Sequence, residues 1–169
     1  MSFRVAGLSP EPFRHLFGLP DDELARQGIH RFVADSQSRY PDRIELRDVA
    51  PGESVLLLNY LHQPAESPYR ASHAIFVREG ATETRVVVDE IPDALRVRPL
   101  SLRAFDDRGM IVAAELVDGS EMAVAVKRLL ADERAAYVHA HFAQRGCYAA
   151  RIDRCVTGSS AGSSSEGRA

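Results

Sequence analysis

Two histidines separated by a single residue are the groups most suited to chemistry in this sequence. His139 and His141 lie in residues 135–142, where small or apolar residues alternate with polar ones as they do along a β-strand. The pleat of such a strand sends Tyr137, His139 and His141 to one face, with neighbouring side chains about 7 Å apart. We therefore expect two adjacent imidazoles that can share one ligand, one phosphate group or one metal ion.

A second polar segment follows the apolar residues 55–58. Its loop, residues 64–70, contains two prolines, which restrict the backbone and hold neighbouring side chains at low entropic cost. Stiff loops between buried strands commonly carry binding residues. Among the polar residues in this loop and at the two strand ends, those suited to binding a ligand are Tyr60, His62, Tyr69, Arg70, Ser72 and His73.

Together the two segments predict a pocket for a small anion such as a phosphate, a nucleotide or a carboxylate. Imidazoles act as general acid and base near neutral pH, while guanidinium and hydroxyl groups stabilise negative charge. The candidate catalytic residues are His73, His139 and His141, with Arg70 as the charge-stabilising group. The candidate ligand-binding residues are Tyr60, His62, Tyr69, Arg70, Ser72, Arg145 and Cys147. The sequence identifies no cofactor and leaves open whether the protein is an enzyme.

Two other functions fit the same residues. In the first, the strands form the surface of a non-catalytic protein-interaction module. In the second, His139 and His141 begin a metal site, but a third ligand at short spacing is missing, because Gln144 stands where cupin-like patterns carry Glu. We therefore assign no metal ligand from the sequence. Cys147 beside a histidine is a weaker candidate nucleophile.

Composition and charge exclude several partners. The chain has 21 basic residues, of which only Lys127 is lysine, against 24 acidic residues, for a net charge of −3. Because the arginines are interspersed with acids along the whole chain, we expect no duplex nucleic-acid partner. Glycine-rich phosphate-binding motifs are absent, which excludes nucleotide hydrolysis of the P-loop kind.

The sequence also indicates where the protein resides. Residues 1–8 lack the apolar stretch of a secretory signal, and no uninterrupted apolar run approaches the ~20 residues that span a bilayer. We expect a cytoplasmic protein with no membrane partner, in which Cys147 and Cys155 are reduced thiols. The oligomeric state is not indicated.

The elements that position these residues follow from hydrophobic periodicity and turn chemistry. Short helices are expected at residues 10–17 and 20–28, and a third is expected to begin with a capping box formed by Asp118 and Glu121. A tight turn at residues 106–109 predicts a hairpin between residues 100–105 and 110–117. The other predicted strands are residues 3–7, 29–34, 43–47, 54–60, 72–78, 84–88, 135–142 and 147–153.

This series of strands with about three helices predicts an α+β fold with a largely antiparallel sheet. Residues 1–155 form one domain of ordinary size, in which residues 55–58 are expected to be a central strand covered on both faces. Residues 156–169 consist mainly of Gly, Ser and Ala, and we expect them to be disordered.

Several motifs resemble a bacterial family known only as a domain of unknown function. The specific ones are Tyr60-x-His62-Gln63-Pro64 and Ser67-Pro68-Tyr69-Arg70-x-Ser72-His73-Ala74-Ile75-Phe76-Val77-Arg78-Glu79, and shorter ones are Arg103-Ala104-Phe105-Asp106 and Arg145-Gly146-Cys147-Tyr148-Ala149-Ala150-Arg151. The resemblance extends over residues 3 to about 154. It implies a small stand-alone bacterial cytoplasmic protein without an established activity, so it carries no catalytic role to any residue.

Overall fold

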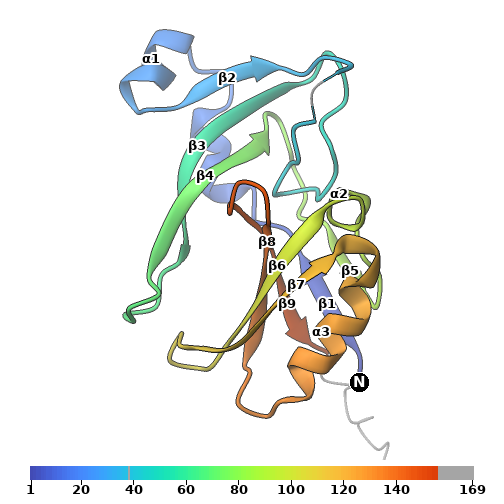
Figure 1. Ribbon diagram of the computed structural model, residues 1–169. Helices are drawn as coiled ribbons and strands as arrows, with labels where there is room; N and C mark the ends of the chain where they lie inside the picture. The colour runs from blue at the N-terminus through green and yellow to red at the C-terminus, as the bar shows by residue number, and fades with distance from the viewer. Residues whose placement is uncertain (38, 156–169) are drawn as a thin grey trace, which may run out of the picture.

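The strands divide into two antiparallel sheets (Figure 1). In the computed structural model, which describes residues 1–37 and 39–155, the strands are β1 (Phe3–Ala6), β2 (His30–Val33), β3 (Ser54–Gln63), β4 (Ala71–Arg78), β5 (Val86–Val88), β6 (Pro99–Phe105), β7 (Ile111–Asp118), β8 (Tyr137–Phe142) and β9 (Tyr148–Arg154). One sheet has the order β5-β1-β9-β8-β6-β7 and the other the order β2-β3-β4. The tail, residues 156–169, for which we expected disorder, lies outside the described residues.

The main core lies between the six-stranded sheet and the helix α3 (Met122–Ala131). The apolar stripe of α3, which includes Met122, Val126 and Leu129, is buried against strand residues such as Leu102 and Ala140. Figure 1 shows α3 lying across one side of this sheet. The face of β8 that bears Tyr137, His139 and His141 is therefore turned away from the helix, as the alternation predicts.

A second core covers the three-stranded sheet. The helices η1 (Glu11–Leu16) and α1 (Asp21–Arg26) bury Phe13 and Leu24 against Leu56 and Ile75 of β3 and β4. Tyr148, at the start of β9, also belongs to this core and so ties the two sheets together. The residues at 55–58 are in the central strand of their sheet, as predicted.

The α+β class with antiparallel pairing in a single domain is confirmed, but three local predictions are wrong. Residues 43–47 form no strand, because the Asp42 carboxylate accepts the backbone N–H groups of Glu45 and Arg78 and bends the segment into a loop. Asp118 makes no side-chain cap; the chain enters α3 through the turn η2 (Gly119–Glu121). The short helix α2 (Asp93–Arg96) is not predicted at all. Within the described part of the chain, no helix is long and apolar enough to cross a membrane.

Gly7 provides a test of how the loop after Asp42 is held. A Cβ atom at Gly7 would lie 2.1 Å from the carbonyl oxygen of Ile44, where two backbone segments meet. The backbone hydrogen bonds from Gly7 to Arg85 and from Leu8 to Arg43 keep these segments from separating. We expect Gly7→Ala to lower the free energy of unfolding by about 2–3 kcal/mol in urea titrations.

Gly52 is the matched control for this substitution. Gly52 has a φ of 88°, and no atom lies within 4 Å of the added Cβ. We therefore expect Gly52→Ala to lower the free energy of unfolding by only about 1 kcal/mol, which is the cost of a left-handed backbone conformation for alanine. Equal losses in the two variants would contradict the steric argument.

Candidate functional site

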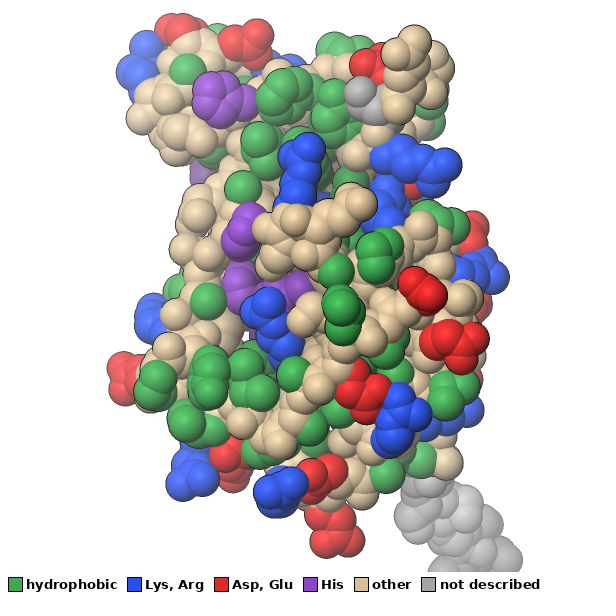
Figure 2. Space-filling view, in the orientation of Figure 1, with side chains coloured by type: hydrophobic (Ala, Val, Ile, Leu, Met, Phe, Trp, Pro, Cys, Tyr) green, Lys and Arg blue, Asp and Glu red, His purple; other side chains and the backbone are tan. Residues whose placement is uncertain are grey.

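Three imidazoles converge between the two sheets. His139 and His141 project from β8 and His62 from the end of β3, and one ligand nitrogen of each lies within 4.8 Å of the others. The ring centroids of His62 and His141 are 5.1 Å apart, and those of His139 and His141 are 6.3 Å apart. Figure 2 shows several histidine side chains and a basic side chain next to one another on one side of the molecule. We refer to His62, His139 and His141 as the histidine cluster.

Two β-bulges determine which side chains point toward the histidine cluster. Leu61 pairs with Ser72 and Gln63 with Ala71, so His62 is the extra residue of a bulge at the end of β3. On β9, Ala150 pairs with Ala140 and Tyr148 with His141, which leaves Ala149 as the extra residue. Because a bulge changes the facing of the side chains beyond it, Tyr148 and Arg151 share the face of the histidines.

The Tyr148 ring forms one wall of the cluster. It stacks on the His62 ring with centroids 5.3 Å apart and an interplanar angle of 9°. The His139 ring meets Tyr148 edge to face at 5.1 Å and lies 5.0 Å from the Phe105 ring. Gln63, next to His62, donates a hydrogen bond of 2.8 Å to the Tyr137 hydroxyl. These contacts hold the end of β3 against β8.

Arg103 is the cation that accompanies the cluster. It lies on β6 directly opposite His139 in the sheet, and its side chain is half-buried. Its Nε donates a hydrogen bond of 3.4 Å to the Ser101 hydroxyl, and it forms no ion pair with any residue that the structure describes. Burial lowers the pKa of Arg103, yet a guanidinium remains charged at neutral pH.

Burial keeps the three imidazoles neutral. Burial, together with the smaller effect of the nearby Arg103 charge, lowers the pKa of His62 to about 4 and the pKa of His139 and of His141 to about 3. Neutral imidazole is the form that binds metal ions, because one ring nitrogen then carries a free lone pair.

One nitrogen of each ring is buried without a hydrogen-bond partner: His62 Nδ1, His139 Nδ1 and His141 Nε2. The tautomer of His141 follows from its other nitrogen, which lies 3.0 Å from the Gly146 carbonyl oxygen. Since a carbonyl oxygen only accepts, Nδ1 of His141 carries the proton and Nε2 has the lone pair. A backbone carbonyl that orients an imidazole in this way is typical of metal-ligating histidines.

The arrangement suits a transition-metal ion of the zinc type. Zinc binds imidazole nitrogen at about 2.0–2.1 Å, which sets ligand nitrogens about 3.3 Å apart in a tetrahedron. The ligand nitrogens of the cluster lie within 4.8 Å of one another, so closing to that spacing needs movements of only about 1–2 Å. Among residues 1–37 and 39–155, no carboxylate joins this set of ligand atoms.

The other candidates that were expected on β3 and β4 lie near the cluster but outside it. Tyr60 is half-buried, with its ring 6.4 Å from that of Tyr148. His73 pairs with Tyr60 across the sheet and is half-buried, but it does not belong to the group of ligand atoms within 4.8 Å. The structure therefore brings His139 and His141 to His62, and leaves His73 at the margin.

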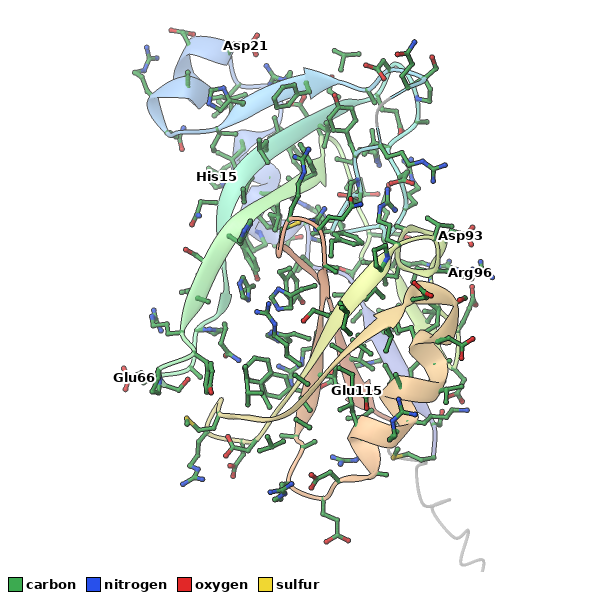
Figure 3. All side chains as sticks on the ribbon, in the orientation of Figure 1. His15, Asp21, Glu66, Asp93, Arg96 and Glu115 are labelled. Carbon is green, nitrogen blue, oxygen red and sulfur yellow. The ribbon has the colours of Figure 1, made fainter. Side chains whose placement is uncertain are left out.

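The loop between β3 and β4 does not supply the expected cation. Tyr69, Arg70 and Ser72 are exposed, and the Arg70 guanidinium donates to the Pro64 carbonyl of its own loop. Glu66 marks the tip of this loop (Figure 3), and the loop contacts the turn between β6 and β7, where the Ser67 hydroxyl donates a hydrogen bond of 2.9 Å to the Gly109 carbonyl oxygen. Arg70 is thus not the charge beside the histidines; Arg103 has that position.

Arg145 and Cys147 lie at a different place. Cys147 is buried and its Sγ accepts a hydrogen bond of 3.2 Å from Arg43, while Arg145 is exposed on the loop between β8 and β9. Both line a cavity that the histidine cluster does not share.

Arg103 and Tyr148 are the site residues that sequence reasoning missed. The alternation in residues 100–105 does put Ser101, Arg103 and Phe105 on one face, which was the available signal. This alternation does not indicate that β6 pairs with β8 or that β9 has a bulge at Ala149, because both depend on contacts between distant segments.

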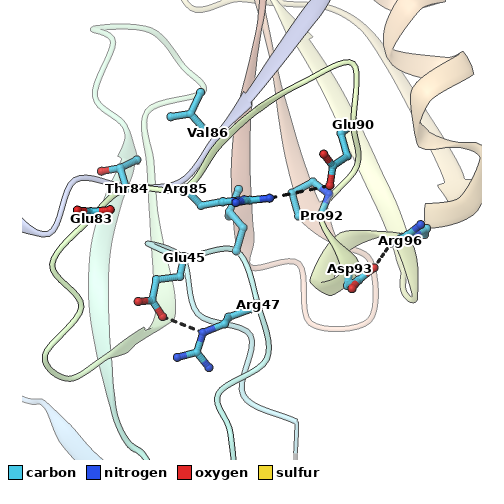
Figure 4. Close-up of a pocket in the computed structure, with 11 residues that line it drawn as sticks. Glu45, Arg47, Glu83, Thr84, Arg85, Val86, Glu90, Pro92, Asp93 and Arg96 are labelled. Atoms are coloured by element: carbon cyan, nitrogen blue, oxygen red, sulfur yellow. Dashed lines mark hydrogen bonds and ion pairs between the residues drawn. The ribbon is translucent and has the colours of Figure 1, made fainter.

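A cavity outside the histidine cluster is a poor candidate because its arginines are paired with its own acidic residues. It has a volume of about 570 Å³ and is lined by Glu45, Arg47, Arg85, Glu90, Asp93 and Arg96, among others. Arg47 pairs with Glu45, Arg85 with Glu90 and Arg96 with Asp93 (Figure 4). No unpaired cation remains there for an anionic ligand.

Comparison with known proteins gives a family but no activity. The model of a family described as "Protein of unknown function (DUF1203)" matches residues 39–154, which include every member of the histidine cluster and Arg103. No curated protein and no solved structure matches the chain.

The lowered pKa values predict how the metal-free protein responds to acid. Each imidazole is neutral when folded down to about pH 3–4 but takes up a proton near pH 6.5 when unfolded. The free energy of unfolding is therefore highest above pH 6.5. It falls as the pH drops below 6.5, by up to about 1.4 kcal/mol per pH unit for each fully buried histidine. Urea titrations between pH 8 and pH 5 in the presence of EDTA measure this slope.

A variant that removes one of the buried imidazoles isolates the effect. His139→Phe places an apolar ring beside Phe105 and Tyr137 and should flatten the slope. His15→Gln, which changes an exposed histidine on η1, should leave it as it is. The same slope in all three proteins would contradict the assignment.

Proposed function

Since the chain belongs to this family of unknown function, we propose its function from the histidine cluster: the protein binds one divalent transition-metal ion through His62, His139 and His141, and a small anion binds at the free coordination position of that ion.

The observation that carries the proposal is the convergence of three imidazoles, each of which buries one nitrogen without a hydrogen-bond partner. Burying a polar atom without a hydrogen bond costs about 1–3 kcal/mol, and His62, His139 and His141 each have such an atom. Coordination of a metal ion would satisfy all three lone pairs at once. A purely structural role would be served better by apolar side chains in the same places.

Acid–base catalysis by the same histidines has less support. A general acid or base works best when its pKa lies near the working pH. Burial moves the pKa values of His139 and His141 to about 3, so neither is protonated at neutral pH.

Zinc is the metal that the ligand set favours. Imidazole suits Zn²⁺, Cu²⁺, Ni²⁺ and Fe²⁺, and three histidines with an open fourth position are a known ligand set of catalytic zinc. Three neutral ligands leave the full charge of the ion uncompensated, and the guanidinium of Arg103 adds a further positive charge. Both favour an anionic fourth ligand, and a bound metal ion would act as a Lewis acid toward it.

Metal content tests the first half of the proposal. Protein purified without a histidine tag is expected to contain one zinc ion per chain by elemental analysis, or to take up one in titration calorimetry after chelation. His141→Gln removes a ligand and should weaken zinc binding by more than about 100-fold.

His73→Gln is the matched control, because His73 lies near the cluster but outside it; this variant should bind zinc as the unaltered protein does. Absence of stoichiometric zinc, copper, nickel or iron binding would overturn the metal site and favour a protein-interaction surface. Equal affinity in the His141→Gln variant would overturn the ligand assignment.

The role of Arg103 tests the second half. In protein loaded with Co²⁺, the visible absorption bands report the fourth ligand, and added azide or acetate should change them. We expect Arg103→Gln to weaken this anion binding by about tenfold while Co²⁺ affinity stays within about twofold.

Arg151→Gln is the control for the anion experiment. Arg151 lies in the same cross-strand row, but it is exposed and paired with Asp153. Its replacement should leave anion affinity unchanged. Equal weakening in the two variants would show a general effect of charge and contradict a specific role for Arg103.

A further inference from the structure

A second group of cations surrounds a cavity apart from the histidine cluster. This cavity, with a volume of about 480 Å³, is lined by four arginines, by aromatic residues and by Cys147, and no acidic residue lines it. The arginines are Arg39, Arg43, Arg98 and Arg145. They come from the loop before β3, from the segment that leads into β6, and from the loop between β8 and β9.

Arg43 is the most deeply buried member of the group, with 1% of its surface exposed. Its guanidinium donates to the carbonyl oxygens of Tyr148 and Pro41 and to the sulfur of Cys147, and it lies 4.8 Å from the centre of the Phe142 ring. None of these partners is a carboxylate. The neighbouring Asp42 is engaged elsewhere, with backbone N–H groups.

The other arginines are only partly compensated. Arg98 donates a hydrogen bond of 2.5 Å to Asp48 and lies 5.3 Å from the centre of the Phe142 ring. Arg39 shares the same carboxylate at 3.7 Å. Arg145 is exposed and forms no ion pair within the described part of the chain. One carboxylate therefore serves the whole group, which leaves an excess of positive charge around the cavity.

Aromatic side chains also line the cavity, and a simple inorganic ion would make no favourable contact with them. Tyr40 and Phe76 meet edge to face at 5.2 Å on one side of the cavity, and Phe142 lies under the two guanidinium groups. Guanidinium groups pair with phosphate oxygens in two-point hydrogen bonds, and aromatic walls accommodate a planar apolar body.

We propose that this cavity is a second, metal-independent binding site, and that its ligand is a small organic phosphate with an aromatic or other planar body. Arg98 and Arg145 would hold the phosphate group, the buried Arg43 would add positive charge behind it, and Tyr40 and Phe76 would contact the body.

Phenyl phosphate is a suitable probe, because it combines both parts of the expected ligand. In titration calorimetry with EDTA present, we expect one molecule to bind per chain, and inorganic phosphate and benzoate to bind at least about tenfold more weakly. Preference for inorganic phosphate would contradict the contribution of the aromatic walls. Preference for benzoate would contradict the choice of phosphate over carboxylate.

Arg145→Gln is the decisive variant, since Arg145 is exposed and its replacement should not disturb folding. We expect it to weaken phenyl phosphate binding by about tenfold. Arg96→Gln, on the charge-paired cavity of Figure 4, should have no effect. Absence of phenyl phosphate binding, or equal affinity in the two variants, would overturn the proposal.

Cys147 supplies an independent readout inside the cavity. In a Cys155→Ser background, phenyl phosphate should slow the alkylation of Cys147 by iodoacetamide, measured by mass spectrometry. Unchanged alkylation at saturating phenyl phosphate would place the ligand elsewhere and overturn the site. His62→Gln, which changes a cluster residue on β3 that does not line the cavity, should leave this protection intact, so failure of the metal site and failure of this one are distinguishable.

Discussion

Three imidazoles between the two sheets, each with one buried nitrogen that has no hydrogen-bond partner, are the constraint around which the described structure is arranged. Each of them costs free energy as long as it has no partner, yet the surrounding contacts hold them together rather than letting them reach solvent. Tyr148 stacks on His62, the Gly146 carbonyl orients His141, and Phe105 packs on His139. The free-energy cost of these unpartnered nitrogens must be offset by other interactions, and the burial of apolar side chains in the two main cores contributes to that offset.

Contacts of the same residues also hold the two sheets against each other. Tyr148 belongs to the six-stranded sheet through its backbone and to the core of the three-stranded sheet through its ring. Its carbonyl oxygen accepts a hydrogen bond from Arg43, which is buried in the loop that follows Asp42. That loop is in turn anchored by the close backbone contact at Gly7. Tyr148 thus joins the histidine cluster on one side to the arginine-lined cavity on the other.

The sequence predicted what depends on local pattern and not what depends on long-range pairing. Alternation in residues 135–142 was enough to put His139 and His141 on one polar face, and the series of strands was enough for the α+β class. The contribution of His62 depends on a bulge and on the packing of one sheet over another, and neither leaves a periodic signal. The expectation for residues 43–47 failed because a buried arginine and a side-chain turn at Asp42 replaced strand pairing.

At a few positions, the use of arginine rather than lysine has a physical reason. Many of the arginines are paired with nearby carboxylates, as Arg47 is with Glu53 and Arg31 with Glu79, and these stabilise loops on the surface. Arg103 and Arg43 are different, because neither has an acidic partner among the described residues, although Arg103 is half-buried and Arg43 is fully buried. A lysine in such a place would readily lose its proton, whereas a guanidinium keeps its charge and can lie against an aromatic ring, as Arg43 does on Phe142. The positive charge available to the two proposed binding sites is therefore that of the few arginines that the acidic residues leave uncompensated.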